Sequence, residues 1–162
     1  MTKPLIALYQ PDIPGNTGSI LRLGACLGLG IHIIGPAGFD MTDRALKRAG
    51  MDYIEMATLT RHDGWEEFEA WRQAEARRLV LMTTQSATPY AGTDGEAIAA
   101  RDVVLFGRES AGVPPKVHDA ADARLTIPMV EGRRSLNLAM SVAIVAGEIT
   151  RRFGLNAVPP HA

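Results

Sequence analysis

Cysteine is almost missing from this sequence, and so are histidine clusters. Cys26 is the single cysteine among 162 residues, so no disulfide can form within the chain. Its neighbours Leu23, Ala25 and Leu27 are small or apolar, which predicts a packed, inert thiol. The four histidines lie far apart, and no histidine or cysteine group has the spacing of metal ligands. We therefore expect no structural metal.

Long apolar runs and an excess of positive charge are missing too. The run LIALY at residues 5–9 is too short for a signal peptide. The longest uncharged apolar-rich stretch, residues 135–147, falls short of the ~20 residues of a membrane-spanning helix. These absences predict a cytoplasmic protein with no membrane partner. The net charge is −1, so a nucleic acid would have to bind local basic patches.

What the sequence does contain is a regular alternation of apolar runs and helical patterns. The runs are short and rich in β-branched residues, as in strands covered on both faces; they lie at residues 5–9, 31–35, 78–84, 102–107 and 124–129. Helical patterns lie at residues 19–29, 43–49, 63–76 and 136–153, with Asn16 or Thr17 capping the first and Thr42 the second. This order predicts one α/β domain at residues 1–155, with a mostly parallel sheet and helices on both faces, and a disordered tail at 156–162.

The last predicted helix is apolar or small nearly all round in its first three turns. Such a helix is buried on more than one side, whereas the sheet of a chain this small covers only one side. Cover by a second subunit predicts a homodimer. The alternative is a monomer in which other helices cover the remaining side.

Three loops each follow a predicted strand; the first of them contains no charge, and the third is polar and doubly basic. They span residues 82–93, 107–114 and 128–135. Because the carboxyl ends of parallel strands meet at one edge of a sheet, we expect these loops to form the walls of one pocket. Main-chain groups in such loops suit a flat, neutral heterocycle. The sequence has no G-x-G-x-x-G, no G-x-x-x-x-G-K-[ST] and no G-x-S-x-G, so neither a dinucleotide site, a P-loop nor a serine hydrolase is expected.

Two charged residues stand out in segments that otherwise contain few charges. Arg22 is the only formal charge between Asp12 and Asp40. It is either a surface arginine whose stem covers apolar neighbours or a cation that points into the cleft. Glu109 lies in a loop bounded by glycine and proline, and it is either solvated or part of the site. Position alone leaves both pairs of alternatives open.

Three segments resemble the motifs of SPOUT-class RNA methyltransferases. PGNTGSILRLGACLG at residues 14–28 resembles the first motif, LFGRESAGVP at 105–114 the second, and IPMVEGRRSLNLAMSVAI at 127–144 the third. RALKRAGMDY and RLVLMTT are similar to segments of the small members that methylate the ribose 2′-hydroxyl of cytidine or uridine at the wobble position of tRNA. The likeness extends over residues 6–153.

This resemblance implies a fold with a C-terminal trefoil knot and a homodimer with the active site at the subunit interface. It also implies S-adenosylmethionine as cofactor and the tRNA anticodon stem-loop as partner. The implied cofactor-binding residues are Met82, Gly107, Ile127 and Ser135, with Leu81, Thr83, Met129, Leu136 and Asn137 beside them. Arg22 would be catalytic, but because arginine stays protonated, we expect it to bind phosphate or stabilise the developing alkoxide. The proton would then leave through water or through a neighbouring carboxylate, for which Glu109 is the candidate.

A basic helical face is the expected RNA-binding surface. Arg44, Lys47 and Arg48 have the i, i+3, i+4 spacing that places side chains on one face of a helix. Such a face is usually only solvated, but a weakly acidic protein that binds RNA needs a local patch. The expected RNA-binding residues are Asn16, Arg44, Lys47, Arg48, Arg133 and Arg134. Two rival functions stay open: a non-catalytic RNA-binding factor that kept the fold, and an oxidoreductase with a nicotinamide cofactor.

Overall fold

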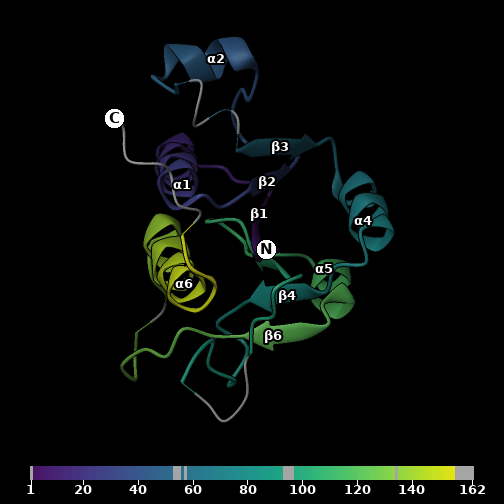
Figure 1. Cartoon of the computed structure of the whole chain (residues 1–162), viewed down its shortest axis with the longest axis vertical. Helices are drawn as coiled ribbons and strands as arrows, with labels where there is room; N and C mark the ends of the chain where they lie inside the picture. Colours follow the sequence, from purple (N-terminus) through teal and green to yellow (C-terminus); the bar gives the residue numbers. More distant parts are fainter. Residues whose placement is uncertain (1, 53–55, 57, 93–96, 134, 156–162) are drawn as a thin grey trace.

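The computed structural model describes residues 2–52, 56, 58–92, 97–133 and 135–155 (Figure 1). Its centre is one six-stranded sheet with the order β3-β2-β1-β5-β4-β6, in which every neighbouring pair is parallel. The strands are β1 Leu5–Tyr9, β2 Ile31–Ile34, β3 Leu59–His62, β4 Leu79–Met82, β5 Val103–Phe106 and β6 Ala123–Leu125. The predicted α/β fold with a mostly parallel sheet is confirmed, and the sheet is parallel throughout.

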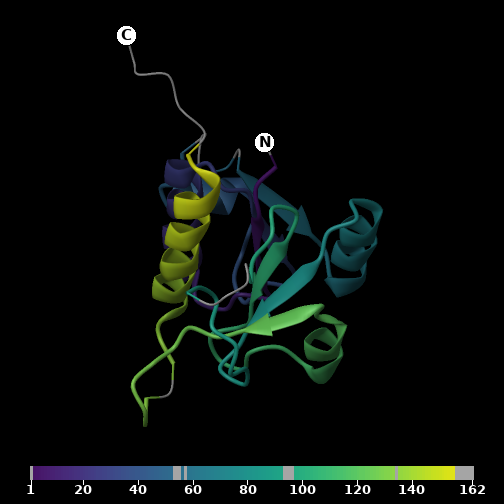
Figure 2. The ribbon, with the colours of Figure 1, turned by 60° about the horizontal axis from the view of Figure 1, so that its bottom comes forward.

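Helices cover both faces of this sheet, as predicted. They are α1 Pro14–Leu27, α2 Asp43–Arg48, α4 Trp65–Ala74, α5 Pro115–Ala120 and α6 Leu138–Phe153. Helices α1 and α6 lie side by side on one face, and α4 and α5 lie on the other (Figures 1 and 2). Helix α2 lies beyond the edge strand β3, away from the centre of the sheet (Figure 1). The C-terminal knot stays a prediction, and the proposed tail at 156–162 falls outside the described residues.

The strands are apolar without alternation because both of their faces are buried. Ile6 and Leu8 pack under α1 and α6, whereas Ala7 and Tyr9 pack on the opposite face. The same alternation repeats in β4 and β5, whose residues are all buried. The two cores therefore fix the sheet between two helical layers.

The start of α1 differs from the prediction. The helix begins at Pro14, with Ile13 as N-cap and no side-chain cap, so Asn16 and Thr17 lie inside the helix. Proline is favoured at a first helical position because its fixed φ suits the helix and its missing N–H costs no hydrogen bond there. The predicted cap of α2 is confirmed, since the Thr42 hydroxyl accepts from the Ala45 amide at 3.2 Å.

Three further features were not predicted or were predicted wrongly. Strand β3 is half polar and lies at the sheet edge, and α5 follows two prolines, so neither shows a clear apolar period. The prediction of a packed Cys26 is wrong, because this thiol is exposed on α1. In the ranges that the structure describes, no helix is long and apolar enough to cross a membrane, and no group of acidic, histidine or cysteine side chains could hold a metal.

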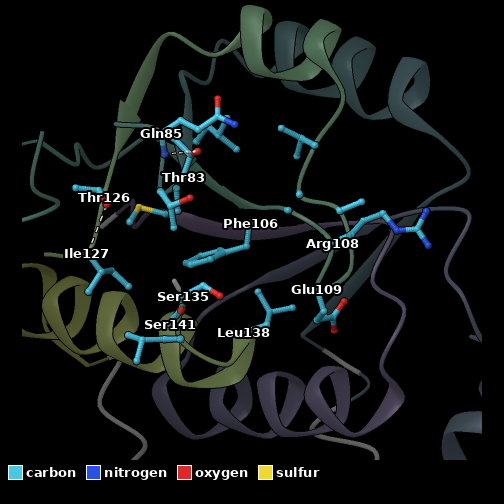
Figure 3. Close-up of a pocket in the computed structure, with 18 of the residues that line it drawn as sticks. Thr83, Gln85, Phe106, Arg108, Glu109, Thr126, Ile127, Ser135, Leu138 and Ser141 are labelled. Atoms are coloured by element: carbon cyan, nitrogen blue, oxygen red, sulfur yellow. Dashed lines mark hydrogen bonds between the residues drawn. The ribbon is translucent and has the colours of Figure 1, made fainter. Parts of the chain in front are cut away.

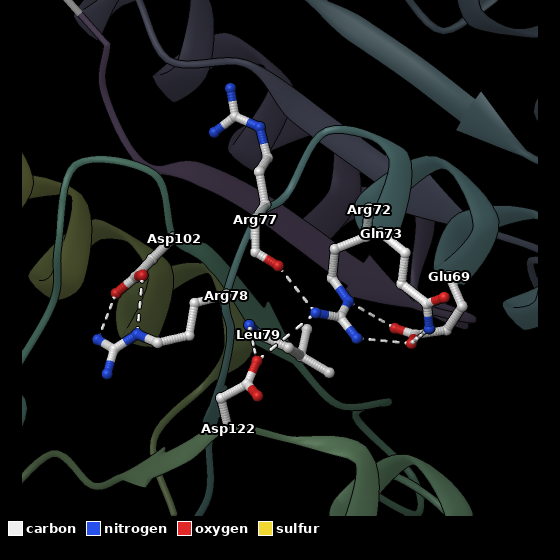
Figure 4. A network of polar contacts seen from close by, with 8 residues as sticks. All are labelled: Glu69, Arg72, Gln73, Arg77, Arg78, Leu79, Asp102 and Asp122. Atoms are coloured by element: carbon white, nitrogen blue, oxygen red, sulfur yellow. Dashed lines mark hydrogen bonds and ion pairs between the residues drawn. The ribbon is translucent and has the colours of Figure 1, made fainter.

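Ion pairs and hydrogen bonds hold the amino end of the sheet together around β4 (Figure 4). Arg78 donates to both carboxylate oxygens of Asp102, at 2.9 and 2.7 Å. The Leu79 amide donates to Asp122 at 2.7 Å. Arg72 donates to Glu69 at 2.7 and 2.6 Å and to the Arg77 carbonyl at 2.8 Å. These charged groups are paired with one another, so the loops at the opposite, carboxyl end are the place to look for a ligand.

Candidate active site at the carboxyl end of the sheet

A cavity of about 770 Å³ opens where β4, β5 and β6 end (Figure 3). Its walls come from the three strand-exit loops and the start of α6, with Ile13 and Asn16 of the α1 region at one side. Ligand cavities of small molecules and cofactors have volumes of this size. The prediction that these three loops meet in one pocket is confirmed.

Hydrogen bonds between main-chain groups join the wall that follows β4 to the wall that follows β6. The Thr83 amide donates to the Leu125 carbonyl at 2.8 Å, and the Thr126 amide donates to the Thr88 carbonyl at 2.8 Å. The Tyr90 amide donates to the Thr126 carbonyl at 3.0 Å. The two loops therefore form one continuous surface on that side of the cavity.

The wall that follows β5 requires glycine at its first position. A Cβ atom at Gly107 would lie 2.7 Å from two backbone atoms of Gly112. Arg108 and Gly112 exchange both backbone hydrogen bonds, at 3.0 and 2.9 Å, and this closes the loop on itself. The close approach to Gly107 is thus made by the protein's own backbone, and that contact shapes the cavity wall.

A chain of side-chain hydrogen bonds connects the three sequence motifs. The Glu109 carboxylate accepts from the Asp12 amide at 3.0 Å and from the Asn16 side-chain amide at 3.5 Å. The Asn137 side-chain amide donates to Asn16 Oδ1 at 3.1 Å. Asn137 Oδ1 accepts from the amides of Ala139 and Met140 at 2.9 and 3.3 Å and thereby caps α6. Asn16 therefore connects Glu109 and Asn137, which lie 93 and 121 positions further along the chain.

The structure brings most of the expected site residues together. Every expected cofactor-binding residue lines the cavity: Leu81, Met82, Thr83, Gly107, Ile127, Met129, Ser135, Leu136 and Asn137. Glu109 and Asn16 line it as well. Both carboxylate oxygens of Glu109 accept hydrogen bonds, so this residue also holds the α1 region in place.

Other expected residues lie away from the cavity. Arg22 is exposed on α1 and is not among the lining residues. Arg44, Lys47 and Arg48 are exposed on α2, and Arg133 is exposed in the loop before α6. Arg134 falls outside the described residues. None of the expected cationic residues that the structure describes therefore lines the cavity.

Sequence reasoning missed several lining residues. They are Thr84 and Gln85 after β4, Phe106 and Arg108 on either side of Gly107, His118 of α5, and Ser141 on the first turn of α6. Gln85 and Arg108 stand directly in two of the predicted loops, so their positions were a signal for them. His118 belongs to the helix that the sequence did not reveal.

Comparison with known proteins decides the family. Residues 3–147 match the SpoU rRNA Methylase family. The chain belongs to the SpoU rRNA methylase family. The resemblance to SPOUT-class methyltransferases in the three motifs is thereby confirmed.

Individual known proteins are similar to this chain over nearly its whole length. A tRNA (cytidine(34)-2′-O)-methyltransferase of Ancylobacter novellus is 52% identical over 149 residues, which cover 92% of each chain. A solved structure that concerns the 2-OH methylation of C/U34 on tRNA is 34% identical, with a TM-score of 0.81 and coverage of 94% of this chain and 97% of that chain. An AdoMet-bound rRNA methyltransferase from Sinorhizobium meliloti is 28% identical, with a TM-score of 0.78 over 93% of this chain and 56% of that chain.

Proposed function

We propose that this protein is an enzyme that transfers a methyl group from S-adenosylmethionine to the ribose 2′-hydroxyl of the wobble nucleotide, cytidine or uridine, of tRNA. The observation that supports this function best is a cavity that the three strand-exit loops form together, in a chain whose relatives are named tRNA (cytidine(34)-2′-O)-methyltransferases. As an enzyme that methylates tRNA, the protein would act in the cytoplasm.

The residues present fit the methyl donor. The cavity has the volume of a cofactor site, and Leu81, Met82 and Phe106 give it an apolar floor for a nucleoside. The donor contains no phosphate, which agrees with the absence of a glycine-rich phosphate loop. When bound, S-adenosylmethionine supplies an electrophilic methyl group on a sulfonium. The loops after β4 and β6 would hold its nucleoside, and Ser135 and Asn137 would hold its polar end.

The protein's own contribution is alignment and charge. Main-chain walls fix the donor so that the ribose hydroxyl can approach within a near-attack geometry. Asn16 lines the cavity and is held by Glu109 and Asn137, so it is the side chain best placed to meet the RNA. Glu109 is our candidate for the proton acceptor, because it is a cavity-lining carboxylate. Arg22 stays protonated and therefore binds phosphate or stabilises the developing alkoxide.

A homodimer completes the site. Arg22 follows Asn16 by six residues on α1, so the two side chains point about 120° apart around the helix, and Arg22 does not line the cavity of its own chain. Exposed apolar side chains continue from the cavity onto α6: Leu136 lies just before the helix, and Met140 and Ile144 lie on it. Met140 is 63% exposed. A second copy that covers these side chains would bring its own Arg22 to the cavity.

Mixing two inactive variants tests this arrangement. Arg22→Ala removes the guanidinium, and Gly107→Val distorts the wall of the donor cavity, because its side chain would meet the Gly112 backbone. If the two residues act in one site across the interface, randomly reassembled dimers should recover about a quarter of wild-type turnover, because half of the dimers contain one intact site. If both residues act within one chain, no mixture regains activity. Sedimentation of each variant verifies that the dimers still form.

The basic face of α2 would bind the tRNA backbone, together with Arg133. Arg44, Lys47 and Arg48 are all exposed, as a phosphate-binding surface requires. Reversal of charge at Lys47 and Arg48 should raise the RNA concentration needed for half-maximal rate and weaken its salt dependence, with no change in donor affinity. Unchanged RNA affinity would remove α2 from the RNA-binding surface.

Methyl transfer to tRNA tests the function itself. Purified protein, labelled S-adenosylmethionine and total tRNA from a deletion strain should yield a labelled ribose at the wobble nucleotide, detected by mass spectrometry. Bound tRNA without any transferred methyl would instead identify a non-catalytic RNA-binding factor. Arg22→Ala and Arg22→Lys then separate the roles of charge and geometry. If both variants keep full turnover with intact donor binding, Arg22 has neither role.

A further inference from the structure

Arg108 is the only lysine or arginine among the described residues that line the cavity. Its side chain is 32% exposed. It extends outward from the rim beside Glu109, away from Ser135 and Phe106 (Figure 3). A cation in this position faces a ligand group outside the cavity rather than one on the cavity floor.

The guanidinium of Arg108 is held by few contacts. Its Nη1 donates to Gln10 Oε1 at 3.2 Å, and its Nη2 lies 3.6 Å from Asp12 Oδ2. Its Nε is buried and has no hydrogen-bond partner in the described part of the chain. By contrast, Arg78 makes two short hydrogen bonds to one carboxylate, at 2.9 and 2.7 Å. Of the five N–H groups of a guanidinium, Arg108 thus uses one in an ordinary hydrogen bond, and the Nη2 group, 3.6 Å from Asp12, makes no short one.

The main acceptor of Arg108 is itself in an unfavourable conformation. Gln10 follows β1 directly and has φ 43, in the left-handed region that residues other than glycine seldom adopt. Its amide is fixed by a 2.8 Å hydrogen bond to the Ile34 carbonyl. Backbone strain of this kind is concentrated at functional sites, where surrounding contacts maintain it. The Gln10–Arg108 contact is a single 3.2 Å hydrogen bond to a neutral oxygen, and a charged acceptor would bind the guanidinium more strongly.

Asp12 keeps a negative charge near this cation. Hydrogen bonding with Glu109, then with Ser110, and the nearby Arg108 cation lower the pKa of the Asp12 carboxyl. The Ser110 hydroxyl donates to Asp12 Oδ2, the same oxygen that lies nearest Arg108. Asp12 thus keeps Arg108 at the rim of the cavity without occupying both edges of its guanidinium.

We propose, on the basis of the methyltransferase function proposed above, that Arg108 leaves Gln10 and binds a backbone phosphate of the RNA strand whose ribose enters the cavity. A planar guanidinium with free N–H groups suits two-point binding of a phosphate. The other oxyanion within reach is the carboxylate of the methyl donor. The outward direction of Arg108 favours the RNA, because the donor occupies the interior of the cavity.

The test compares three variants for binding of the anticodon stem-loop and of S-adenosylmethionine. Arg108→Gln removes the charge and should weaken RNA binding about tenfold and lower its salt dependence by about one released ion, with donor affinity unchanged. Arg101→Gln is the matched control, since this exposed arginine precedes β5 at the opposite end of the sheet; it should bind RNA like the wild type. Gln10→Gly removes the acceptor and the strain, and it should keep or tighten RNA binding.

The outcomes separate the explanations. Lost donor affinity with unchanged RNA affinity in Arg108→Gln would assign Arg108 to the donor carboxylate and overturn the proposal. If Arg108→Gln and Gln10→Gly weaken RNA binding equally, the pair is only a structural clamp, and the proposal is wrong. A wild-type protein that binds no RNA and transfers no methyl would refute the proposed function itself. An active wild type with an equally active Arg108→Gln would refute only the role of Arg108.

Discussion

Acidification from pH 7 to pH 5 should cost this fold about 2 kcal/mol through one buried histidine pair. His32 Nδ1 and His62 Nε2 lie 2.8 Å apart, and the two rings stack at 5.1 Å beside Trp71 and Phe68. Both side chains are buried, with 6% and 5% of their surfaces exposed. One nitrogen of this contact must donate and the other must accept, so the pair cannot take up two protons without losing the hydrogen bond.

The magnitude follows from the pKa of His32. Burial, then the neighbouring His62 and then the Arg77 cation lower the pKa of His32 from 6.5 to about 4. Burial also lowers the pKa of His62, which Glu67 partly opposes. Between pH 6.5 and pH 4 the unfolded chain therefore binds more protons than the folded chain, so stability falls as the pH falls. The full contribution of His32 is present above pH 6.5. The loss at pH 5 from His32 alone is about 2 kcal/mol.

Urea unfolding at fixed protein concentration, followed by tryptophan fluorescence at pH 7 and pH 5, measures this loss. The variant His32→Phe/His62→Phe replaces both partners with apolar rings of similar shape, which is often close to neutral for stability. It should lose about 2 kcal/mol less than the wild type between the two pH values. His118→Gln, at the remaining described histidine, is the control and should behave like the wild type. An equal pH dependence in the double variant and the wild type would refute the argument.

Three further predictions concern the cavity and its surroundings. Gly107→Ala places a Cβ 2.7 Å from the Gly112 backbone and should cost about 1–3 kcal/mol and weaken donor binding, measured by calorimetry; unchanged donor affinity would contradict it. Asn137→Ala removes the cap of α6 and should cost about 1 kcal/mol in thermal unfolding, with a larger loss than Ser141→Ala, its control on the same helix. Met140→Asp should leave monomer stability within about 0.5 kcal/mol but abolish the dimer in sedimentation; a dimer that persists would exclude the exposed apolar side chains of α6 as the interface.

The sequence predicted the centre of the fold well because the central strands have strong local signals. Strands β1, β2, β4 and β5 are wholly apolar or nearly so, and burial on both faces leaves that mark on any sequence. Strand β3 is LTRH, with two exposed residues, so its strand character comes from pairing with β2 and not from its composition. Helix α5 has only six residues, of which one is buried, and no periodic pattern can develop over that length.

The site was predictable in its position but not in its contacts. The carboxyl ends of parallel strands lie at one edge of a sheet, so a prediction of parallel strands was enough to predict that their exit loops meet. The partners of Glu109 could not be predicted, since Asp12 and Asn16 lie 97 and 93 positions away and only the folded chain joins them. Cys26 shows the opposite limit: small and apolar neighbours in sequence say little about which side of a helix faces solvent.

The hydrogen-bonded chain from Glu109 through Asn16 to Asn137 has a consequence for how the molecule responds to its ligands. These three residues belong to the β5 exit, to α1 and to the start of α6, so no excised fragment can contain the complete site. A donor that binds only the assembled site stabilises all three regions together. Amide exchange should then slow in α1 and α6 at once when the donor is added, although α1 provides little of the cavity wall.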